Sequence, residues 1–499
     1  MTASLCHMIN PTPPWTHKDL TLVAILMFAG GVLRIIGLNE GLWFDEISTL
    51  VNNVRLPAGE IIESYRSRNN HVLYSLIAHY SIAWFGEFPW ALRLPAALFG
   101  IATIPAAYYL GRQLASRNEA FLAVAFLAFN YHHVWFSQNG RGYTGLLLGA
   151  VLLSSCFIRL LTTDKPGYRP VLAYAVIAAL TSWIHLTAAL VVIAHGIIWL
   201  AVISPLARKE NADFKVAAAL GISLAGIFSL ALYAPLLTRL AGEYSAGVTS
   251  PEYWTAWHTT GWVLAEIWKA ALSAVPGGWP IILLGALAMI AGVWSYLKQG
   301  IVSAGILILP VLVILFFVHR FSEVFFPRFL FVSAVFFLLI AVRGGFVLSR
   351  AVLPMLNARQ VTIIGLAIAL ATATKVPGAW KPKQDFVAAA EFISANCVPG
   401  DAVVCFTQTF TPLHRYLGLD CRRPATMNEL NELEKAHSRT WFLYTFPVPF
   451  QGSLPDVWDK VQNEYNSVTR FGSTVGGGDI VIMLKSTNPA RVGHSKPLL

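Results

Sequence analysis

The stretch "GLWFDEISTL" at residues 41–50 places two adjacent carboxylates, Asp45 and Glu46, directly after an apolar run long enough to enter a membrane. Only 12% of the chain is charged, so a pair of acids in this position needs an explanation. The pair is either the solvated end of a helix that leaves the membrane or part of an active site. On the local pattern alone the two interpretations are equally good, and the surrounding sequence has to separate them.

Composition gives the class of protein. Of the 499 residues, 56% are hydrophobic and only 12% are charged. In an average soluble protein roughly a quarter of the residues are charged. We therefore predict an integral membrane protein. The net charge of +10 could suggest nucleic acid as a partner. However, the basic residues are scattered through short loops and form no continuous stripe, so we predict no nucleic-acid binding.

Eleven stretches have the composition of a membrane span, which needs about 20 mostly apolar residues. They lie near 20–38, 92–111, 119–136, 144–162, 170–186, 187–205, 216–238, 278–297, 301–318, 327–343 and 360–374. No small-residue cleavage site follows the first stretch, so we expect a retained span and not a signal peptide. The shorter run at 71–86, "HVLYSLIAHYSIAWFG", could be a span or a helix in the membrane interface.

The charges of the loops favour the interfacial position for 71–86. With that assignment, the loops on one side contain Arg112, Arg117, Lys165, Arg169, Arg208, Lys209, Lys215, Lys298, Arg343, Arg350 and Arg359. This side is cytoplasmic by the positive-inside rule. Counting 71–86 as a span would send Arg112 and Arg117 outward. The outer loops are then 39–91, 137–143, 239–277 and 319–326, and the tail lies outside as well. We expect a plasma or inner membrane protein.

The tail differs from the rest of the chain. Residues 1–374 form the predicted transmembrane domain, whose outer loop 39–91 carries juxtamembrane helices, and residues 375–499 form a predicted soluble α/β domain. In the tail "DAVVCF", "RTWFLYTF" and "DIVIMLK" read as strands, while "KQDFVAAAEFISAN" and "DVWDKVQNEYNSV" have helical periodicity. "STVGGGD" precedes a strand and opens no helix, so we interpret it as a turn and not as a phosphate-binding loop.

The five cysteines have no CxxC spacing, which excludes a zinc ribbon and a thioredoxin-like site. Three of them, Cys397, Cys405 and Cys421, lie in the predicted outer domain. They could supply one disulfide and leave one thiol over. Unpaired buried cysteines are an equally good interpretation.

The predicted outer loops collect unusual polar side chains. They are Asp45 and Glu46 after the first span, Arg66, Arg68, Asn69, Asn70 and His71 in the first loop, Gln138, Arg141 and Tyr143 after the third span, and His319, Arg320, Glu323 and Arg328 around the tenth. Charges at membrane depth are costly unless they pair or line a wet cavity. We therefore expect these side chains to form a cavity at the outer surface.

Arginine suits phosphate because its planar fork presents parallel donors to two oxygens. Several arginines at the membrane boundary therefore predict a site for a lipid-linked phosphate. In glycosyl transfer with inversion, a carboxylate accepts the proton of the incoming hydroxyl while cations stabilise the departing phosphate. Asp45 is the predicted base, with Glu46 as a second catalytic acid, and the donor phosphate is assigned to Arg141, Arg328 and Arg320. Substrate contacts are predicted for His71, Gln138, Tyr143 and His185.

Five motifs in order resemble a known family: "WFDE" (43–46), "NNHVLY" (69–74), "GEFPWALRLPAALFG" (86–100), "SQNGRGY" (137–143) and "FPRFL" (326–330). They are similar to those of the polyprenyl-phosphate-sugar-dependent glycosyltransferases with the GT-C fold. This family includes protein O-mannosyltransferases and lipid A aminoarabinose transferases. The likeness covers about 20–345, and the tail is also similar to that of some members.

The resemblance implies roles for individual residues. Asp45 matches the catalytic or acceptor-orienting acid, and Glu46 matches its neighbour. His71 stands where members often have a His-Pro pair, with Val72 in place of the proline. Gln138, Arg141 and Tyr143 match one motif, and Arg328 matches the arginine of an Arg-Tyr pair in which Phe329 replaces the tyrosine. The implied donor is a polyprenyl-phosphate sugar, and the implied acceptor is a hydroxyl of a glycan, lipid or protein.

Structural explanations exist beside these functional ones. Arg141 and Arg328 could be arginines that reach toward the interface, His185 could be a hydrogen-bonded packing histidine, and Arg93 could serve in packing or at lipid headgroups as well as in catalysis. Asp45, Glu46 and His71 could also hold a divalent cation. Because the arginines already neutralise the negative charge of the phosphate, we predict no obligatory metal ion. We make no firm prediction of a cofactor.

Three other functions remain open from the sequence. One is a transferase of the same fold that modifies lipid A or a cell-wall glycan instead of protein. Another is a flippase or transporter for lipid-linked sugars, although such proteins often show repeated halves and broken helices that are not evident here. The third is a receptor that uses the tail as its binding module. Specificity is expected to lie in the 239–277 loop, which contains Glu243, Tyr244, Glu252, Trp254 and Trp257.

Overall fold

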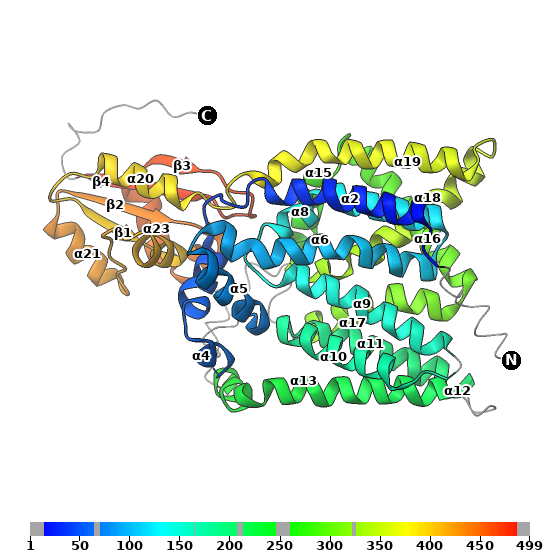
Figure 1. Ribbon diagram of the computed structural model, residues 1–499. Helices are drawn as coiled ribbons and strands as arrows, with labels where there is room; N and C mark the ends of the chain where they lie inside the picture. The colour runs from blue at the N-terminus through cyan, green and yellow to red at the C-terminus, as the bar shows by residue number, and fades with distance from the viewer. Residues whose placement is uncertain are drawn as a thin grey trace.

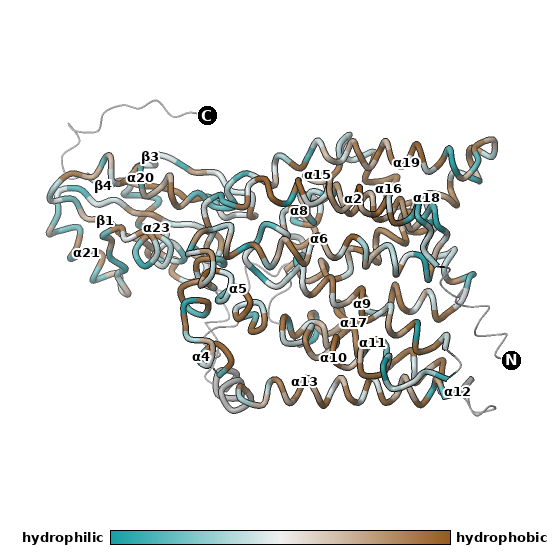
Figure 2. Tube along the Cα trace, viewed as in Figure 1, coloured by the Kyte–Doolittle hydropathy of each residue, from teal (hydrophilic) through white to brown (hydrophobic). Residues whose placement is uncertain are grey.

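The structure is a computed structural model that describes residues 14–63, 70–163, 165–206, 213–245, 260–321 and 326–486. Long helices run side by side in one bundle, and a small sheet domain lies at one end of it (Figure 1). Apolar residues dominate the helices of the bundle, whereas the sheet domain is more polar (Figure 2). The predicted architecture, a polytopic helical membrane protein with a small α/β domain, is confirmed.

All eleven predicted spans fall on helical structure. The helices concerned are α2 (His17–Ile35), α6 (Pro89–Leu114), α7 (Arg117–Phe129), α8 (Tyr131–Ser137), α9 (Tyr143–Thr162), α10 (Tyr168–Ile184), α11 (Ala188–Ile198), η2 (Trp199–Ile203), α12 (Ser204–Leu206), α13 (Asp213–Ser245), α16 (Trp279–Gln299), α17 (Ile301–Phe321), η4 (Pro327–Ser333), α18 (Ala334–Val352), α19 (Ala358–Thr372) and η5 (Ala373–Trp380). Among the described residues, seven helical segments are long and apolar enough to cross a membrane. The predicted number of eleven is therefore not confirmed.

Two predicted boundaries are wrong. The stretch 119–136 is not one span, because Asn130 leaves the helical conformation and its side chain accepts a hydrogen bond from His133 N, which starts α8. The predicted outer loop 239–277 contains the end of α13 and a separate helix, α15 (Thr260–Ala274). Of the residues expected to decide specificity, Glu243 and Tyr244 lie at the end of α13, and Glu252, Trp254 and Trp257 lie outside the described residues.

Glycines allow two helices of the bundle to approach closely. On α16, a Cβ at Gly292 would lie 1.9 Å from the carbonyl oxygen of Ile340, and on α18 a Cβ at Gly344 would lie 1.7 Å from the carbonyl oxygen of Ala288. Only glycine fits at such distances. Small residues that bring helix backbones together are typical of membrane helix packing, where the hydrophobic effect supplies little attraction between helices.

The outer loop between α2 and α6 is mostly helical. It contains α3 (Phe44–Thr49), η1 (Leu50–Val54), α4 (Ala58–Glu63) and α5 (Val72–Phe85), all near the sheet-domain end of the bundle (Figure 1). Near the end of α5, Tyr80, Trp84 and Phe85 are exposed. Exposed aromatic side chains of this kind are enriched at membrane interfaces, and they agree with the interfacial position predicted for 71–86.

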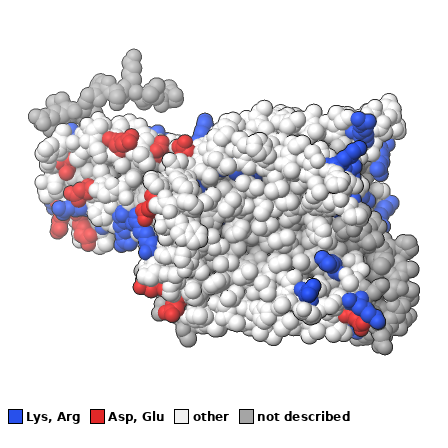
Figure 3. All heavy atoms as spheres, viewed as in Figure 1, with Lys and Arg blue, Asp and Glu red and all other residues white. Residues whose placement is uncertain are grey.

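Charged side chains divide between the two ends of the molecule. On the visible face, Lys and Arg dominate the end of the bundle away from the sheet domain, whereas the sheet domain carries both signs and the flank between the two ends is almost free of charge (Figure 3). Arg112 in the last turn of α6 and Arg117 at the start of α7 lie where α6 ends, on the side of the bundle away from the sheet domain (Figure 1). An uncharged belt between two charged ends is the pattern expected of a protein that spans a bilayer.

The C-terminal domain has one four-stranded sheet in the order β1-β2-β4-β3. Its strands are β1 (Ala402–Cys405), β2 (Arg439–Tyr444), β3 (Asn466–Phe471) and β4 (Ile480–Ser486), and its helical elements are α20 (Phe386–Asn396), η6 (Thr407–Thr409), η7 (Thr411–Tyr416), α21 (Met427–Ala436), α22 (Pro447–Ser453) and α23 (Pro455–Glu464). Strand β1 pairs with β2 in parallel, and the other two pairings are antiparallel. The helix predicted up to residue 468 ends at Glu464 in α23, and the residues that follow form β3, which the sequence did not predict.

The cysteines and the glycine-rich segment of this domain can be compared with their predictions. Cys405 and Cys421 form a disulfide, and Cys397 is a free thiol. One bridge with one cysteine left over is therefore the alternative that the structure selects. The segment "STVGGGD" is a turn between β3 and β4 in which Gly477 has a φ of +69°, a conformation that favours glycine. The turn interpretation is confirmed.

Candidate active site

Asp45 lies in the first turn of α3, where two arginines from distant parts of the chain approach it. Its Oδ2 is 3.6 Å from Nη1 of Arg141, in the connection between α8 and α9, and 3.6 Å from Nη1 of Arg328, in η4. The side chains of Asp45 and Arg141 are nearly buried, whereas that of Arg328 is 31% exposed. The fold thus brings together the predicted base and two of the three predicted phosphate ligands.

His71 extends this cluster on the side of Arg141. The imidazole Nε2 is 2.8 Å from Nη2 of Arg141, and Nδ1 accepts a hydrogen bond from the backbone N–H of Gly142 at 3.2 Å. The rings of Tyr143 and His185 lie edge-on at centroid distances of 5.4 and 4.7 Å. Three of the four predicted substrate residues are therefore neighbours.

The charge state of His71 follows from this environment. Burial, followed by the positive charge of Arg141, the neighbouring His185 and the charge of Arg328, lowers the pKa of His71 well below its ordinary value. The ring is therefore neutral at physiological pH. A neutral imidazole can accept a proton or a hydrogen bond, so His71 adds an uncharged polar group to a pocket that is otherwise strongly cationic.

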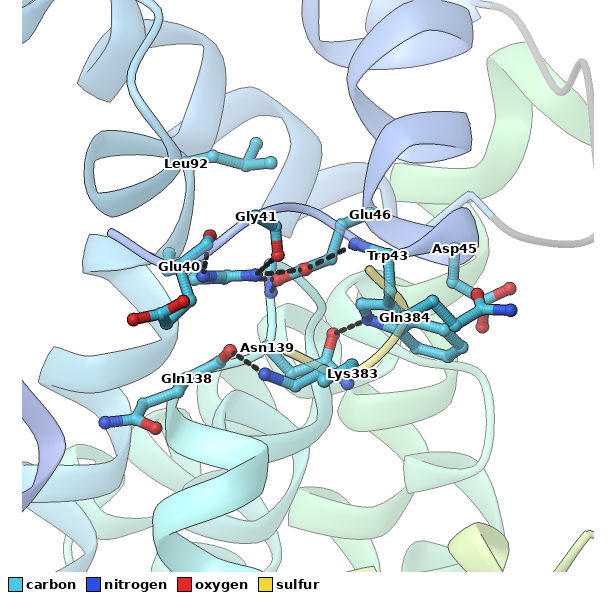
Figure 4. A network of polar contacts seen from close by, with 12 residues as sticks. Glu40, Gly41, Trp43, Asp45, Glu46, Leu92, Gln138, Asn139, Lys383 and Gln384 are labelled. Atoms are coloured by element: carbon cyan, nitrogen blue, oxygen red, sulfur yellow. Dashed lines mark hydrogen bonds and ion pairs between the residues drawn. The ribbon is translucent and has the colours of Figure 1, made fainter. Parts of the chain in front are cut away.

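Glu46 has a different environment from its neighbour. Figure 4 shows Asp45 and Glu46 pointing to different sides of α3. Glu46 is fully buried, and its carboxylate accepts hydrogen bonds from Arg93 at 2.7 and 2.6 Å and from the N–H of Gly140 at 2.5 Å. Burial raises the pKa of Glu46, but the charges of Arg93 and Lys383 and these hydrogen bonds outweigh it and leave the pKa below its ordinary value.

Arg93 is the centre of this second cluster. All of its donor nitrogens are engaged, because Nη1 donates to the carbonyls of Leu38 and Glu40 at 3.0 and 2.7 Å, and Nη2 also donates to that of Gly41 at 3.0 Å. Arg93 therefore fixes the segment that leads into α3 as well as Glu46. Of the roles considered for Arg93, the structure favours packing and positioning.

Gln138 contacts the end of α2. Its Nε2 donates to the carbonyls of Leu33, Arg34 and Ile36, the first two at 3.3 and 3.1 Å. These carbonyls lie at the C-terminal end of α2, where helix carbonyls lack partners within the helix. The predicted substrate contact of Gln138 stays a prediction, while the contacts that the structure gives it hold α2 against the 138–141 segment.

Other predicted residues lie apart from the cluster around Asp45 or outside the described part of the chain. Arg320 is exposed in the last turn of α17, beside His319, and its role at the donor stays a prediction. Arg66, Arg68, Asn69 and Glu323 lie outside the described residues. For a metal, no group of three or more His, Cys, Asp or Glu side chains gathers within the described part of the chain. Because the carboxylate of Glu46 is bound by Arg93, Asp45 and Glu46 do not present two carboxylates to one cation.

The sequence did not predict two neighbours of the site, Lys383 and Gln384. Lys383 Nζ donates to the carbonyl of Gln138 at 2.7 Å, and Gln384 Oε1 accepts from the N–H of Phe44 at 3.1 Å. Both side chains are buried (Figure 4). The only signal in the sequence was a polar pair at the start of a predicted helix of the outer domain, which gave no reason to connect them with α3.

Part of the chain matches a known protein family. A family described as dolichyl-phosphate-mannose-protein mannosyltransferase matches residues 71–237, about a third of the chain. No curated protein sequence matches the chain.

Among solved structures, ArnT from Cupriavidus metallidurans bound to undecaprenyl phosphate is 12% identical, with 94% of this chain and 98% of that chain covered and a TM-score of 0.53. The oligosaccharyltransferase AglB from Archaeoglobus fulgidus, in complex with an inhibitory peptide and a dolichol-phosphate, is 11% identical. The match covers 96% of this chain and 75% of that one, with a TM-score of 0.54.

The class of protein is therefore a membrane protein with the GT-C fold. The resemblance predicted from the motifs is confirmed, because residues 71–237 are similar to the protein mannosyltransferase family and the fold of the chain is similar to that of ArnT. The general activity that these matches support is that of a membrane glycosyltransferase.

Proposed function

We propose that the protein transfers a sugar from a polyprenyl-phosphate carrier to an acceptor hydroxyl at the extracytoplasmic face of the membrane, with inversion at the sugar. The observation that carries the proposal is the approach of Arg141 and Arg328 to a single carboxylate oxygen, each at 3.6 Å. A carboxylate between two guanidiniums marks a place where an anion of two or more oxygens can be bound by parallel donors.

Binding of the donor phosphate and release of the Asp45 carboxylate are coupled in this arrangement. The phosphate competes with Asp45 for the guanidinium groups of Arg141 and Arg328. Once the arginines hold the phosphate, Asp45 is available to accept the proton of the acceptor hydroxyl. The hydroxyl oxygen then forms the new bond to the anomeric carbon while the bond to the phosphate oxygen breaks. The arginines stabilise the charge that develops on the departing polyprenyl phosphate.

His71 and Glu46 support this chemistry in different ways. The His71 ring lies against Arg141, with Nε2 at 2.8 Å from Nη2, while Nη1 of the same arginine lies 3.6 Å from Asp45. Glu46 and Arg93 form a buried ion pair that fixes α3 and the N–H of Gly140. We therefore assign Glu46 to positioning and Asp45 to proton transfer.

The distribution of charge supports the proposed face of the membrane. The site lies at the end of the bundle that carries the sheet domain, and the basic residues gather at the opposite end (Figures 1 and 3). By the positive-inside rule the basic end is cytoplasmic, which supports an extracytoplasmic site. The solved relatives ArnT and AglB were obtained with undecaprenyl phosphate and dolichol-phosphate respectively, which supports a polyprenyl-phosphate donor for this chain.

The test is transfer by protein reconstituted with polyprenyl-phosphate sugars and candidate glycan, lipid and peptide acceptors. Asp45→Asn removes the base with little change in volume, and we expect it to lower turnover by at least about 100-fold while the donor still binds. Asp420→Asn, an exposed acid of the sheet domain, is the matched control. Transfer by Asp45→Asn at the wild-type rate would contradict the proposal. Movement of the lipid without a new glycosidic bond would indicate a flippase.

A further inference from the structure

Two adjacent residues at the start of the sheet domain contact both segments that carry the proposed catalytic groups. Gln384 accepts a hydrogen bond from Phe44, the residue before Asp45, and Lys383 donates one to Gln138, three residues before Arg141. Lys383 is 3% exposed and Gln384 is fully buried. The domain that lies farthest along the chain is thus in direct contact with the site.

Gln384 completes the N-terminus of α3. The N–H of Phe44 belongs to the first turn of this helix, where backbone donors have no partner within the helix, and the side chain of Trp43 makes no capping hydrogen bond. Gln384 Nε2 donates to Oγ1 of Thr445 at 3.1 Å and to the carbonyl of Gly478 at 2.8 Å. With both ends of the amide engaged, its orientation is fixed, and it connects α3 to the sheet domain.

Lys383 holds the other segment. Its ammonium nitrogen lies 5.1 Å from the centre of the Trp135 ring as well as 2.7 Å from the carbonyl of Gln138. Its backbone carbonyl accepts from the N–H of Thr474 at 3.1 Å, and the Oγ1 of Thr474 accepts from Nε1 of Trp135 at 3.0 Å. The turn between β3 and β4 therefore closes over Lys383 and fixes α8, which leads into the 138–141 segment.

From these contacts we propose that Lys383 and Gln384 are positioning residues of the transferase, through which the sheet domain sets the separation between Asp45 and Arg141. The inference rests on the proposed function for the identity of the groups that are positioned. It explains why these two polar residues are buried at the junction although they lie outside the cluster around Asp45. The sheet domain is then part of the catalytic unit and more than an appended binding module.

The first experiment does not depend on activity. Gln384→Met keeps the length of the side chain and removes its hydrogen bonds. Tyr465→Phe, which removes the hydrogen bond from Tyr465 to Glu434 in the same domain, is the matched control. We expect hydrogen exchange of a peptide spanning 41–54 to be about tenfold faster in Gln384→Met and unchanged in Tyr465→Phe. Equal protection of this peptide in wild type and Gln384→Met would overturn the proposal.

The second experiment measures turnover and donor affinity separately. Because a misplacement of about 1 Å can cost about 100-fold in rate, we expect Gln384→Met to lower kcat by about 10- to 100-fold and to leave KM for the donor within about twofold. Thr474→Val, a milder change at the same junction, should lower kcat in the same direction. A wild-type kcat in Gln384→Met, or an equal loss in Tyr465→Phe, would overturn the proposal. Inactivity of the wild type with every donor would instead refute the proposed function.

Discussion

Loss of Arg93, near the start of α6, should destabilise the protein more than loss of an exposed arginine in the outer loop that precedes this helix. Replacing it with methionine keeps much of its volume but leaves the Glu46 carboxylate buried without its cation. Three backbone carbonyls that accept from Arg93 also lose their donor. Removing one partner of a buried ion pair costs about 3 to 5 kcal/mol, and we expect Arg93→Met to fall in this range.

A double-mutant cycle isolates the pair. Glu46→Gln leaves Arg93 as a buried charge and should cost a similar amount, whereas the double variant removes both charges. Residues in one buried network couple by about 0.5 to 3 kcal/mol, so the double variant should be less destabilised than the sum of the single variants by about 2 kcal/mol. Unfolding in mixed micelles, followed by circular dichroism against denaturant, measures each variant.

The ion pair between Arg55 and Glu87 is the matched control. Its side chains are 37% and 40% exposed, and it lies in the same outer loop. Exposed pairs contribute about 0 to 1 kcal/mol, so Arg55→Met should be nearly neutral. If Arg93→Met stays within about 1 kcal/mol of wild type, or if the two single variants are strictly additive, the buried pair does not hold α3 in place and the reasoning fails.

Three further predictions concern the donor, the disulfide and pH. Arg328→Met removes one charge-assisted contact and should weaken binding of polyprenyl phosphate by about 10- to 100-fold, and unchanged affinity in a titration would remove Arg328 from the site. The Cys405–Cys421 bridge spans 16 positions, so replacing both cysteines with alanine should destabilise the sheet domain by about 3 kcal/mol, which its melting temperature would reveal. Burial, and then the charge of Arg93, lowers the pKa of Lys383 from 10.5 to about 7. Between these two pKa values Lys383 is protonated in the unfolded chain and neutral in the folded protein, so its contribution to stability rises with pH. Over the same pH range, the melting temperature of Lys383→Met should therefore rise less with pH than that of the wild type.

Much of the architecture follows from patterns within single segments. A membrane helix needs an apolar stretch of sufficient length, and the alternation of basic loops orders these stretches across the bilayer. Predicted boundaries of helices were wrong where a single side chain sets the boundary, as at Asn130. They were also wrong where the periodicity of polar residues was ambiguous, as in the residues of α23 and β3. Strand β3 is an edge strand with exposed and half-buried residues, so it lacks the apolar signal of the inner strands.

The site could be predicted only in part for a related reason. Asp45, His71, Arg141 and Arg328 were found because charged and polar side chains are unusual at the membrane boundary, and the fold brings these four together. The different environments of Asp45 and Glu46 could not be predicted from two neighbouring residues in the sequence. They depend on which side of one helical turn faces Arg93, a contact across 47 positions of the chain.

The hydrogen bond between Phe44 and Gln384 also sets the order in which the protein matures. These two residues are 340 positions apart, and at about 5 to 20 residues per second the ribosome needs roughly 20 to 70 s to travel from one to the other. During this interval the start of α3 lacks its partner while most of the membrane helices are being inserted. On the proposed mechanism, the enzyme therefore reaches its final active geometry only after the last domain has been made and folded. A nascent or truncated chain in the membrane would then hold the arginines proposed to bind the donor without a properly placed Asp45.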